Sequence, residues 1–171
     1  MTNERILYHF VLLIFLLLPY FGCNGSPHPH DLPPLYPAVL VLTQEGKPLE
    51  NALVVLYSTD SNFKWSVAAV SDRNGKATLL THGKFFGVPA GEYKIIITKT
   101  EASDQNVSDS NSSHNPEVYT PIPTRTLFSL VEKQYTDIAT TPFTIIIEKG
   151  KNVQNLDIGK AVREKFQTVT L

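Results

Sequence analysis

The sequence predicts an all-β protein whose main body is a single Greek-key β-sandwich of seven short strands. Two observations indicate this class. Glycine and proline recur at short intervals through the 171 residues, and the stretches between them are rich in valine, isoleucine, leucine and threonine, which favour strands. The chain is also long enough to form one domain with its own hydrophobic core.

The expected strands alternate with turn signals in the order 38–42, 53–57, 65–70, 76–80, 92–99, 143–148 and 153–158. In the fifth strand Tyr93, Ile95 and Ile97 share one face, which we predict to be buried. Asp72-Arg73-Asn74-Gly75 is a strong hairpin signal, because asparagine and glycine tolerate the positive φ of tight turns. The last two strands are expected to form a closing hairpin around 149–152.

Three further segments carry weaker signals. Residues 101–116 are rich in serine, asparagine and aspartate. We predict a disordered insert within the sandwich here, because so few apolar groups cannot offset the entropy of ordering. Residues 127–133 are expected to form a short helical turn. The C-terminal tail, residues 160–171, is compatible with either a helix or a strand.

An apolar run near the N-terminus, Phe10 to Leu18, has the length of a signal-peptide core. It is shorter than the roughly 20 apolar residues that a membrane-spanning helix needs. We therefore expect residues 1–22 to be a signal peptide and the protein to be exported. The only cysteine, Cys23, follows this run. It is either a lipidation site, an incidental thiol or a residue near the cut of an ordinary signal peptide, and its position favours lipidation.

Residues 20–23 resemble the lipobox of bacterial lipoproteins, in which a small residue precedes the cysteine that is acylated and becomes N-terminal. Gly22 fits this pattern, whereas Tyr20 and Phe21 depart from it. The resemblance implies a lipoprotein of the bacterial cell envelope, held to the membrane by acyl chains such as palmitate on Cys23. Two or more such chains give stable anchoring without a spanning helix.

The segment 23–37 is proline-rich and is predicted to be an extended tether of roughly 40 Å, at about 3.1 Å per residue. Asn24 follows the cysteine where aspartate would signal retention, which implies the outer membrane by resemblance to lipoprotein sorting. The formal net charge of −1 gives no electrostatic basis for binding nucleic acid. The expected partners are therefore the membrane and an envelope protein or a glycan.

Three motifs lie at turns of the expected sandwich, residues 38–159. They read Gly-Lys-Pro-Leu-Glu-Asn-Ala-Leu-Val at 46–54, Ser-Asp-Arg-Asn-Gly-Lys-Ala at 71–77 and Val-Pro-Ala-Gly-Glu-Tyr-Lys-Ile at 88–95. In this order they resemble the carboxypeptidase regulatory-like domain, one of the transthyretin-like (prealbumin-like) sandwiches. The resemblance implies the fold and is unspecific for function.

Candidate catalytic chemistry is sparse. The transthyretin-like 5-hydroxyisourate hydrolases end in Tyr-Arg-Gly-Ser, whereas this chain ends in Thr-Val-Thr-Leu. Of the five histidines, only His82 falls in the expected folded core, and one histidine makes neither an iron site nor a hydrolase dyad. We therefore predict no catalytic residue, no metal site and no cofactor. A small hydrolase-like enzyme that depends on His82 is the least favoured alternative.

Four aromatic residues flank the expected loops and are candidate ligand contacts: Phe63, Trp65, Phe85 and Phe86. Gathered at one end of a sandwich, they would stack on a sugar ring or a partner protein. The alternative, which we favour for Trp65, is a core position on the third strand, and Phe85 and Phe86 are expected to straddle the sheet. The sequence thus predicts a non-enzymatic, lipid-anchored envelope protein that acts as a structural or interaction module. The alternative is a carbohydrate- or peptide-binding module that uses these aromatics.

Overall fold

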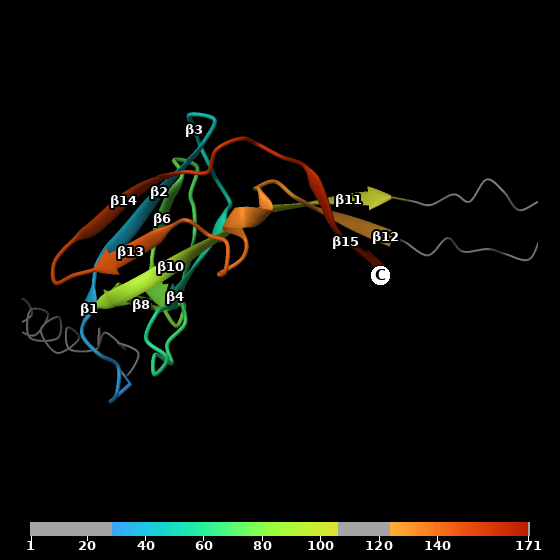
Figure 1. Ribbon diagram of the computed structural model, residues 1–171. Coiled ribbons are helices and arrows are strands. Elements are labelled where there is room, and N and C mark those ends of the chain that lie inside the picture. Colours follow the sequence, from blue (N-terminus) through green and yellow to red (C-terminus); the bar gives the residue numbers. More distant parts are fainter. Residues whose placement is uncertain (1–28, 106–123, 171) are drawn as a thin grey trace, which may run out of the picture. The chain divides into compact units, whose positions relative to one another are not determined.

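The computed structural model describes residues 29–105 and 124–170. Within them every regular element is a β-strand except one turn of 3-10 helix, η2 (Lys133–Tyr135) (Figure 1). The prediction of an all-β protein is therefore confirmed. The chain divides into two compact units, residues 1–32 and 33–171, and all of the strands named below belong to the second. No helix in the described ranges is long and apolar enough to cross a membrane.

The described residues of the second unit form four sheets. The six-stranded sheet, in the order β13-β10-β4-β5-β7-β8, is made of β4 (Leu53–Ser58), β5 (Val67–Val70), β7 (Leu80–Thr81), β8 (Phe85–Phe86), β10 (Gly91–Thr98) and β13 (Thr144–Ile147). The four-stranded sheet is made of β2 (Ala38–Gln44), β3 (Lys47–Pro48), β6 (Lys76–Thr78) and β14 (Asn152–Asp157). The two-stranded sheet pairs β1 (Leu35–Tyr36) with β9 (Val88–Pro89). The three-stranded sheet has the order β11 (Thr100–Gln105), β12 (Thr124–Ser129) and β15 (Glu164–Thr170).

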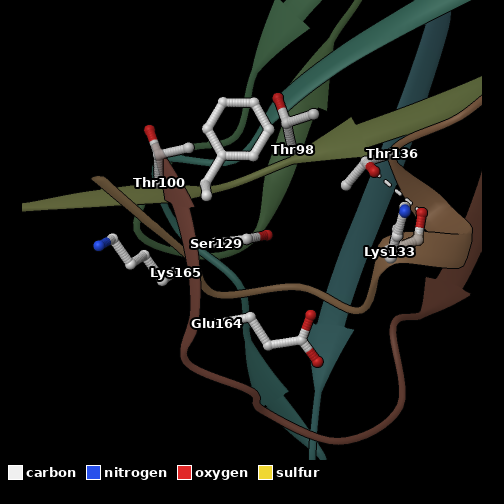
Figure 2. A pocket seen from close by; sticks show the side chains of 8 residues that line it. Thr98, Thr100, Ser129, Lys133, Thr136, Glu164 and Lys165 are labelled. Atoms are coloured by element: carbon white, nitrogen blue, oxygen red, sulfur yellow. Dashed lines mark hydrogen bonds between the residues drawn. The ribbon is translucent and has the colours of Figure 1, made fainter. Parts of the chain in front are cut away.

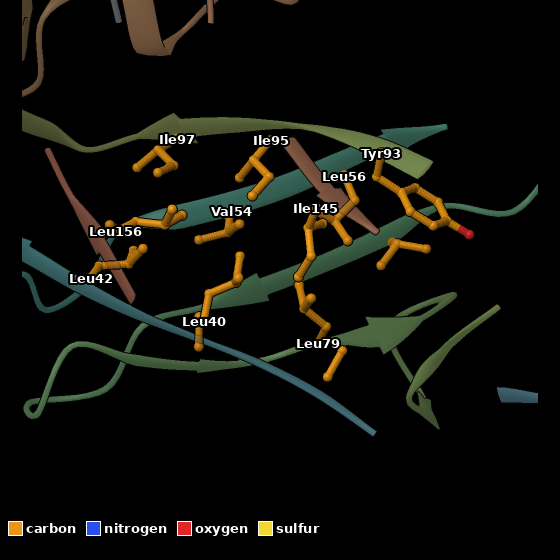
Figure 3. Close-up of a cluster of buried hydrophobic side chains, with 14 of the residues drawn as sticks. Leu40, Leu42, Val54, Leu56, Leu79, Tyr93, Ile95, Ile97, Ile145 and Leu156 are labelled. Carbon is orange, nitrogen blue, oxygen red and sulfur yellow. The ribbon is translucent and has the colours of Figure 1, made fainter. Parts of the chain in front are cut away.

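The hydrophobic core forms between the inner faces of the six-stranded and four-stranded sheets (Figure 3). Alternation along β10 buries Tyr93, Ile95 and Ile97 completely, as predicted from their shared face. On β2 the same alternation buries Leu40 and Leu42. Full burial of side chains of this size stabilises the fold by about 1.5–3 kcal/mol each, so the facing sheets hold the domain together.

The turn at 72–75 forms as predicted, but it does not close a hairpin. The Gly75 N–H donates to the Asp72 carbonyl oxygen at 2.9 Å, and the Asp72 carboxylate accepts from the N–H groups of Asn74 and Lys76. The flanking strands lie in different sheets, because β5 pairs with β4 and β7 whereas β6 pairs with β2. The turn therefore carries the chain from the six-stranded to the four-stranded sheet. The expected strand 76–80 is divided for the same reason.

The expected closing hairpin of 143–148 and 153–158 is wrong. β13 pairs with β10 in the six-stranded sheet, and β14 pairs in parallel with β2 in the four-stranded sheet. The Asn152 side chain accepts from the Glu148 N–H at 3.0 Å and donates to the Glu148 carbonyl oxygen at 3.0 Å. These bonds close a turn that crosses from the six-stranded to the four-stranded sheet. β13 and β14 then lie on opposite sides of the core, and each turns its apolar face toward it.

Three segment boundaries differ from those expected. β1 places the end of the predicted tether, 23–37, inside the folded unit. β11 extends to Gln105 within the predicted disordered insert 101–116, whose remaining residues lie outside the described ones. β12 occupies part of 127–133, and the helical turn begins later, at Lys133. The tail 160–171 adopts the strand alternative as β15. Pairing within the three-stranded sheet provides hydrogen-bond partners for the backbone N–H and C=O groups of β11, β12 and β15, although these strands contain few apolar residues.

Candidate functional site

A cavity of about 520 Å³ lies where the three-stranded sheet meets the end of β10 and η2 (Figure 2). Its lining comprises Thr98, Thr100, Ser129, Lys133, Thr136, Glu164, Lys165 and Phe166; we call it the junction cavity. The pairing register explains part of this set, because Thr100, Ser129 and Glu164 occupy one row across β11, β12 and β15. The cavity therefore depends on a sheet that sequence reasoning did not expect.

A β-bulge places the aromatic wall of the junction cavity. The register between β12 and β15 shifts at Leu127/Phe128, so that Lys165 pairs with Phe128 and Gln167 with Leu127, which leaves Phe166 unpaired between them. Bulges re-aim side chains in this way, and 66% of the Phe166 side chain is exposed. An exposed ring beside hydroxyl and charged groups is a surface on which a sugar or a polar peptide could stack.

Hydrogen bonds fix two of the hydroxyls in the cavity wall. Ser129 Oγ donates to the Val131 carbonyl oxygen at 2.8 Å, and Thr136 Oγ1 donates to the Lys133 carbonyl oxygen at 2.9 Å. Both oxygens keep lone pairs that can accept from a ligand. Next to this wall Tyr135 is buried, and its burial, together with the charges of Glu132 and Asp157, raises the pKa of its hydroxyl.

Arg163 joins the strands beside the cavity. Its guanidinium lies 3.7 Å from the centroid of the Phe128 ring, and its Nε lies 3.4 Å from a carboxylate oxygen of Glu101. About half of each charged side chain is exposed, so solvent screens this ion pair and its contribution to stability is small. These contacts orient the sheet more than they stabilise it.

The predicted ligand contacts are divided between core and surface. Phe63 is partly buried against the core, with its ring edge-on to Tyr93 at 5.4 Å between centroids. The Tyr93 hydroxyl is itself buried and donates to the Pro89 carbonyl oxygen at 2.9 Å. Burial raises the pKa of Tyr93 to about 12. Phe63 therefore packs as a core residue and is not available as a flat stacking surface.

Trp65 does not lie on the third strand as expected, because β5 begins at Val67. Its half-buried ring stands edge-on to the His82 imidazole, with 5.1 Å between centroids. The His82 N–H donates to the Ser66 carbonyl oxygen at 2.8 Å, which holds the segment before β5 against the turn between β7 and β8. Trp65 is thus partly exposed, beside the turn between β7 and β8.

Phe85 and Phe86 straddle the sheet as predicted. Phe85 is buried, with 8% exposed, whereas 78% of Phe86 is exposed on the outer face. The turn that precedes them, residues 82–84, has positive φ at both His82 (54°) and Gly83 (69°), as the central residues of a type I′ turn do. Of the four aromatic candidates, Phe86 is exposed, Phe63 and Trp65 are half-buried, and Phe85 is buried. The predicted lipidation site, Cys23, lies outside the described residues.

Sequence reasoning missed an apolar row on the outer face of the six-stranded sheet. The register aligns the row across five strands: Ile96, Val55, Ala68, Leu80 and Phe86. Contiguous apolar surface of this kind commonly marks an interaction site. The signal was present in the expected strand 53–57, where both alternating faces are apolar.

His82 takes part in one contact with catalytic character. Its Nδ1 lies 3.3 Å from Ser66 Oγ, slightly beyond the usual distance between an activated nucleophile and its base. The ring is held edge-on to Trp65. Within residues 29–105 and 124–170, no group of three or more histidine, cysteine, aspartate or glutamate side chains is arranged to hold a metal ion.

Comparisons with known proteins add little to this picture. No family model matches the sequence, and no curated protein matches it. Among solved structures, a 9R-lipoxygenase from Cyanothece PCC8801 is similar at a TM-score of 0.33 and 15% identity, over 79% of this chain and 18% of the lipoxygenase chain. The chain thus spans less than a fifth of that protein, and a similarity of this size carries no argument about fold or function.

Proposed function

We propose that this protein is a non-enzymatic, lipid-anchored module of the bacterial cell envelope that acts through surface interactions of a transthyretin-like β-sandwich. The observation that carries the interaction role is the apolar row on the outer face of the six-stranded sheet, which ends at the exposed ring of Phe86. Surfaces of this kind are costly to leave in water, and their presence favours binding over a purely structural role.

The anchoring part of the proposal rests on Cys23, which follows a signal-length apolar run and a small residue. Acyl chains at this cysteine would attach the domain through the segment that ends in β1. The fold assignment rests on the three turn motifs and on the two sheets that face each other around one core. The Greek-key order of the sandwich belongs to this proposal.

The anchor is tested by expressing the full chain and a Cys23→Ser variant in a bacterium with two membranes. Intact mass spectrometry of the native mature N-terminus should show cleavage before Cys23 and the added mass of acyl chains. The unmodified protein should fractionate with the outer membrane and the variant should not. A variant that stays membrane-bound to the same degree would contradict the anchor.

The junction cavity supports a second candidate, a glycan-binding module. An exposed ring at Phe166 lies beside hydroxyls and the ammonium of Lys133, a mixture that suits a saccharide with acidic groups. A glycan array should then give signals that a Phe166→Ala variant loses and a Phe86→Ala variant keeps. Equal loss in both variants would argue against the cavity as the site.

A further inference from the structure

One end of the six-stranded sheet carries the half-buried Trp65 and leads into the exposed Phe86. At this end β4 finishes at Ser58, β10 begins at Gly91 and β5 begins at Val67. Consequently the loop 59–66, with Trp65, and the turn 82–84, which leads into Phe86, both project from it. We call this region, loop 59–66 with residues 82–86, the aromatic end.

The N-terminal segment joins the sandwich beside the aromatic end. β1 pairs with β9, so that Tyr36 lies opposite Val88 and Leu35 opposite Pro89. The backbone between β8 and β9 packs so closely there that a Cβ on Gly87 would lie 2.8 Å from the Tyr36 carbonyl oxygen. Phe86 therefore directly precedes the residue that packs against β1, the strand in which the proposed tether ends. Figure 1 shows β1 and β8 together at the end of the sandwich away from β11, β12 and β15.

The length of chain before β1 limits where an anchored domain can stand. Twelve residues lead from Cys23 to Leu35, and a fully extended chain of that length spans at most about 40 Å. β10 runs away from the aromatic end for eight residues, which places its far end about 25 Å further off at about 3.3 Å per residue. The segment that leads from Cys23 joins the sandwich at β1, so of the two ends of the six-stranded sheet the aromatic end lies nearer to the point where this segment is attached.

We propose that the aromatic end docks on the lipid bilayer, with Phe86 inserted among the acyl chains and Trp65 at the level of the headgroups. This inference rests on the proposed anchoring at Cys23. Tryptophan favours the membrane interface because its ring is amphipathic, and a tether raises the effective concentration of the bilayer so that a small apolar surface suffices.

The charges at this end indicate apolar docking, not electrostatic docking. Lys64, Lys84 and Asp60 are exposed there, and Glu92 is exposed at the start of β10, where its carbonyl oxygen accepts from the Thr59 N–H. Together these four side chains carry no net positive charge. Anionic lipid surfaces attract proteins through clusters of lysine and arginine. Docking at the aromatic end should therefore be insensitive to anionic lipid and to salt.

Trp65 is the only tryptophan in the chain and serves as an intrinsic probe of docking. The acylated full-length mature protein is reconstituted into phosphatidylcholine vesicles with and without brominated acyl chains. Trp65 fluorescence should be quenched by the brominated lipid in the native protein and much less in Phe86→Ser. Val70→Ser is the matched control, because Val70 is 59% exposed at the end of β5 away from loop 59–66; its quenching should equal the native value.

Anchoring and docking fail in different ways in this experiment. Vesicle-bound protein with unquenched Trp65 would overturn docking and leave the anchor intact. If the native protein proves not to be acylated, docking is tested by itself by mixing the mature Cys23→Ser chain with the same vesicles. Partitioning that falls about tenfold in Phe86→Ser, and not in Val70→Ser, supports docking alone. If the native protein carries no acyl chains and the Cys23→Ser chain does not partition into the vesicles, both the anchor and docking are overturned.

Two further results would assign the surface to another occupant. Sedimentation in the absence of lipid that shows a dimer, converted to a monomer by Phe86→Ser, would assign the aromatic end to a second copy of this chain and overturn docking. Quenching that requires anionic lipid and disappears at high salt would overturn the apolar mode of docking. Circular dichroism confirms in each case that the variant is folded.

Discussion

The turn at Gly75 offers the sharpest test of how the sandwich is held together. Its backbone has φ of 73° and lies against β2, where the Leu42 N–H donates to the Gly75 carbonyl oxygen at 2.8 Å. The Leu42 carbonyl oxygen in turn accepts from the Leu49 N–H at 3.0 Å. A Cβ at position 75 would overlap that carbonyl oxygen and come within 3.2 Å of the Leu49 nitrogen. The obstacle is backbone, which cannot rotate away as a side chain would.

Gly46 supplies a matched control for the Gly75→Ala substitution. It has the same φ of 73°, but a Cβ there meets no atom within 4 Å. Gly46→Ala should therefore report only the left-handed conformation, which costs about 1 kcal/mol. Gly75→Ala adds the displacement of β2 and the weakening of two buried hydrogen bonds, for a total of about 4 kcal/mol.

Urea unfolding followed by circular dichroism measures both variants. With a slope of about 2 kcal/mol per molar urea, Gly75→Ala should lower the unfolding midpoint by about 2 M and Gly46→Ala by about 0.5 M. Equal midpoints for the two variants would show that the close approach of the turn to β2 does not exist in solution. The docking of the 72–75 turn on the four-stranded sheet would then be wrong.

Three other substitutions have defined outcomes. Ser71→Ala should destabilise the fold by about 2–3 kcal/mol in urea unfolding, because the buried Ser71 hydroxyl bonds two backbone groups at 2.9 and 2.6 Å; a loss below about 0.5 kcal/mol would contradict this. Since the pKa of Tyr93 is raised to about 12, the unfolded chain loses this proton first, and stability should fall between about pH 10 and 12. The fall should reach up to about 1.4 kcal/mol per pH unit and be absent from Tyr93→Phe; parallel profiles would refute the assignment. Arg163→Ala should change stability by less than about 0.5 kcal/mol, because its partners are exposed, and a larger loss in thermal unfolding would show that the three-stranded sheet depends on it.

Local patterns predicted the core of the fold well. The alternation of Tyr93, Ile95 and Ile97 identifies a buried face from the sequence, because side chains two apart on a strand point the same way. The positive φ at Gly75 follows from the Asp-Arg-Asn-Gly turn in the same manner. These features depend on neighbours within a few residues, and therefore they can be read without knowing the partner strands.

The partners of the strands, and the three-stranded sheet, could not be predicted from the local sequence. β14 pairs in parallel with β2, more than 100 residues earlier in the chain, and nothing within 153–158 specifies that partner. β15 pairs with β12 although its exposed residues include Phe166 and several polar groups. The junction cavity exists only because of this long-range pairing, and so the sequence offered no signal for it beyond the isolated aromatic residue.

The separation of the two candidate surfaces connects the proposals. The aromatic end lies where β10 begins, and the junction cavity lies where β10 ends and β11 follows. A domain that docks through loop 59–66 therefore presents the cavity at the opposite end of β10, on the side away from the bilayer. Docking would then orient the cavity toward ligands of the cell envelope that lie above the membrane. A domain that rotates freely on its tether would have no fixed orientation. Two binding measurements test this coupling. In the anchored protein, Phe86→Ser should weaken the binding of a ligand to the cavity. In the Cys23→Ser protein in solution, the same substitution should leave that binding unchanged.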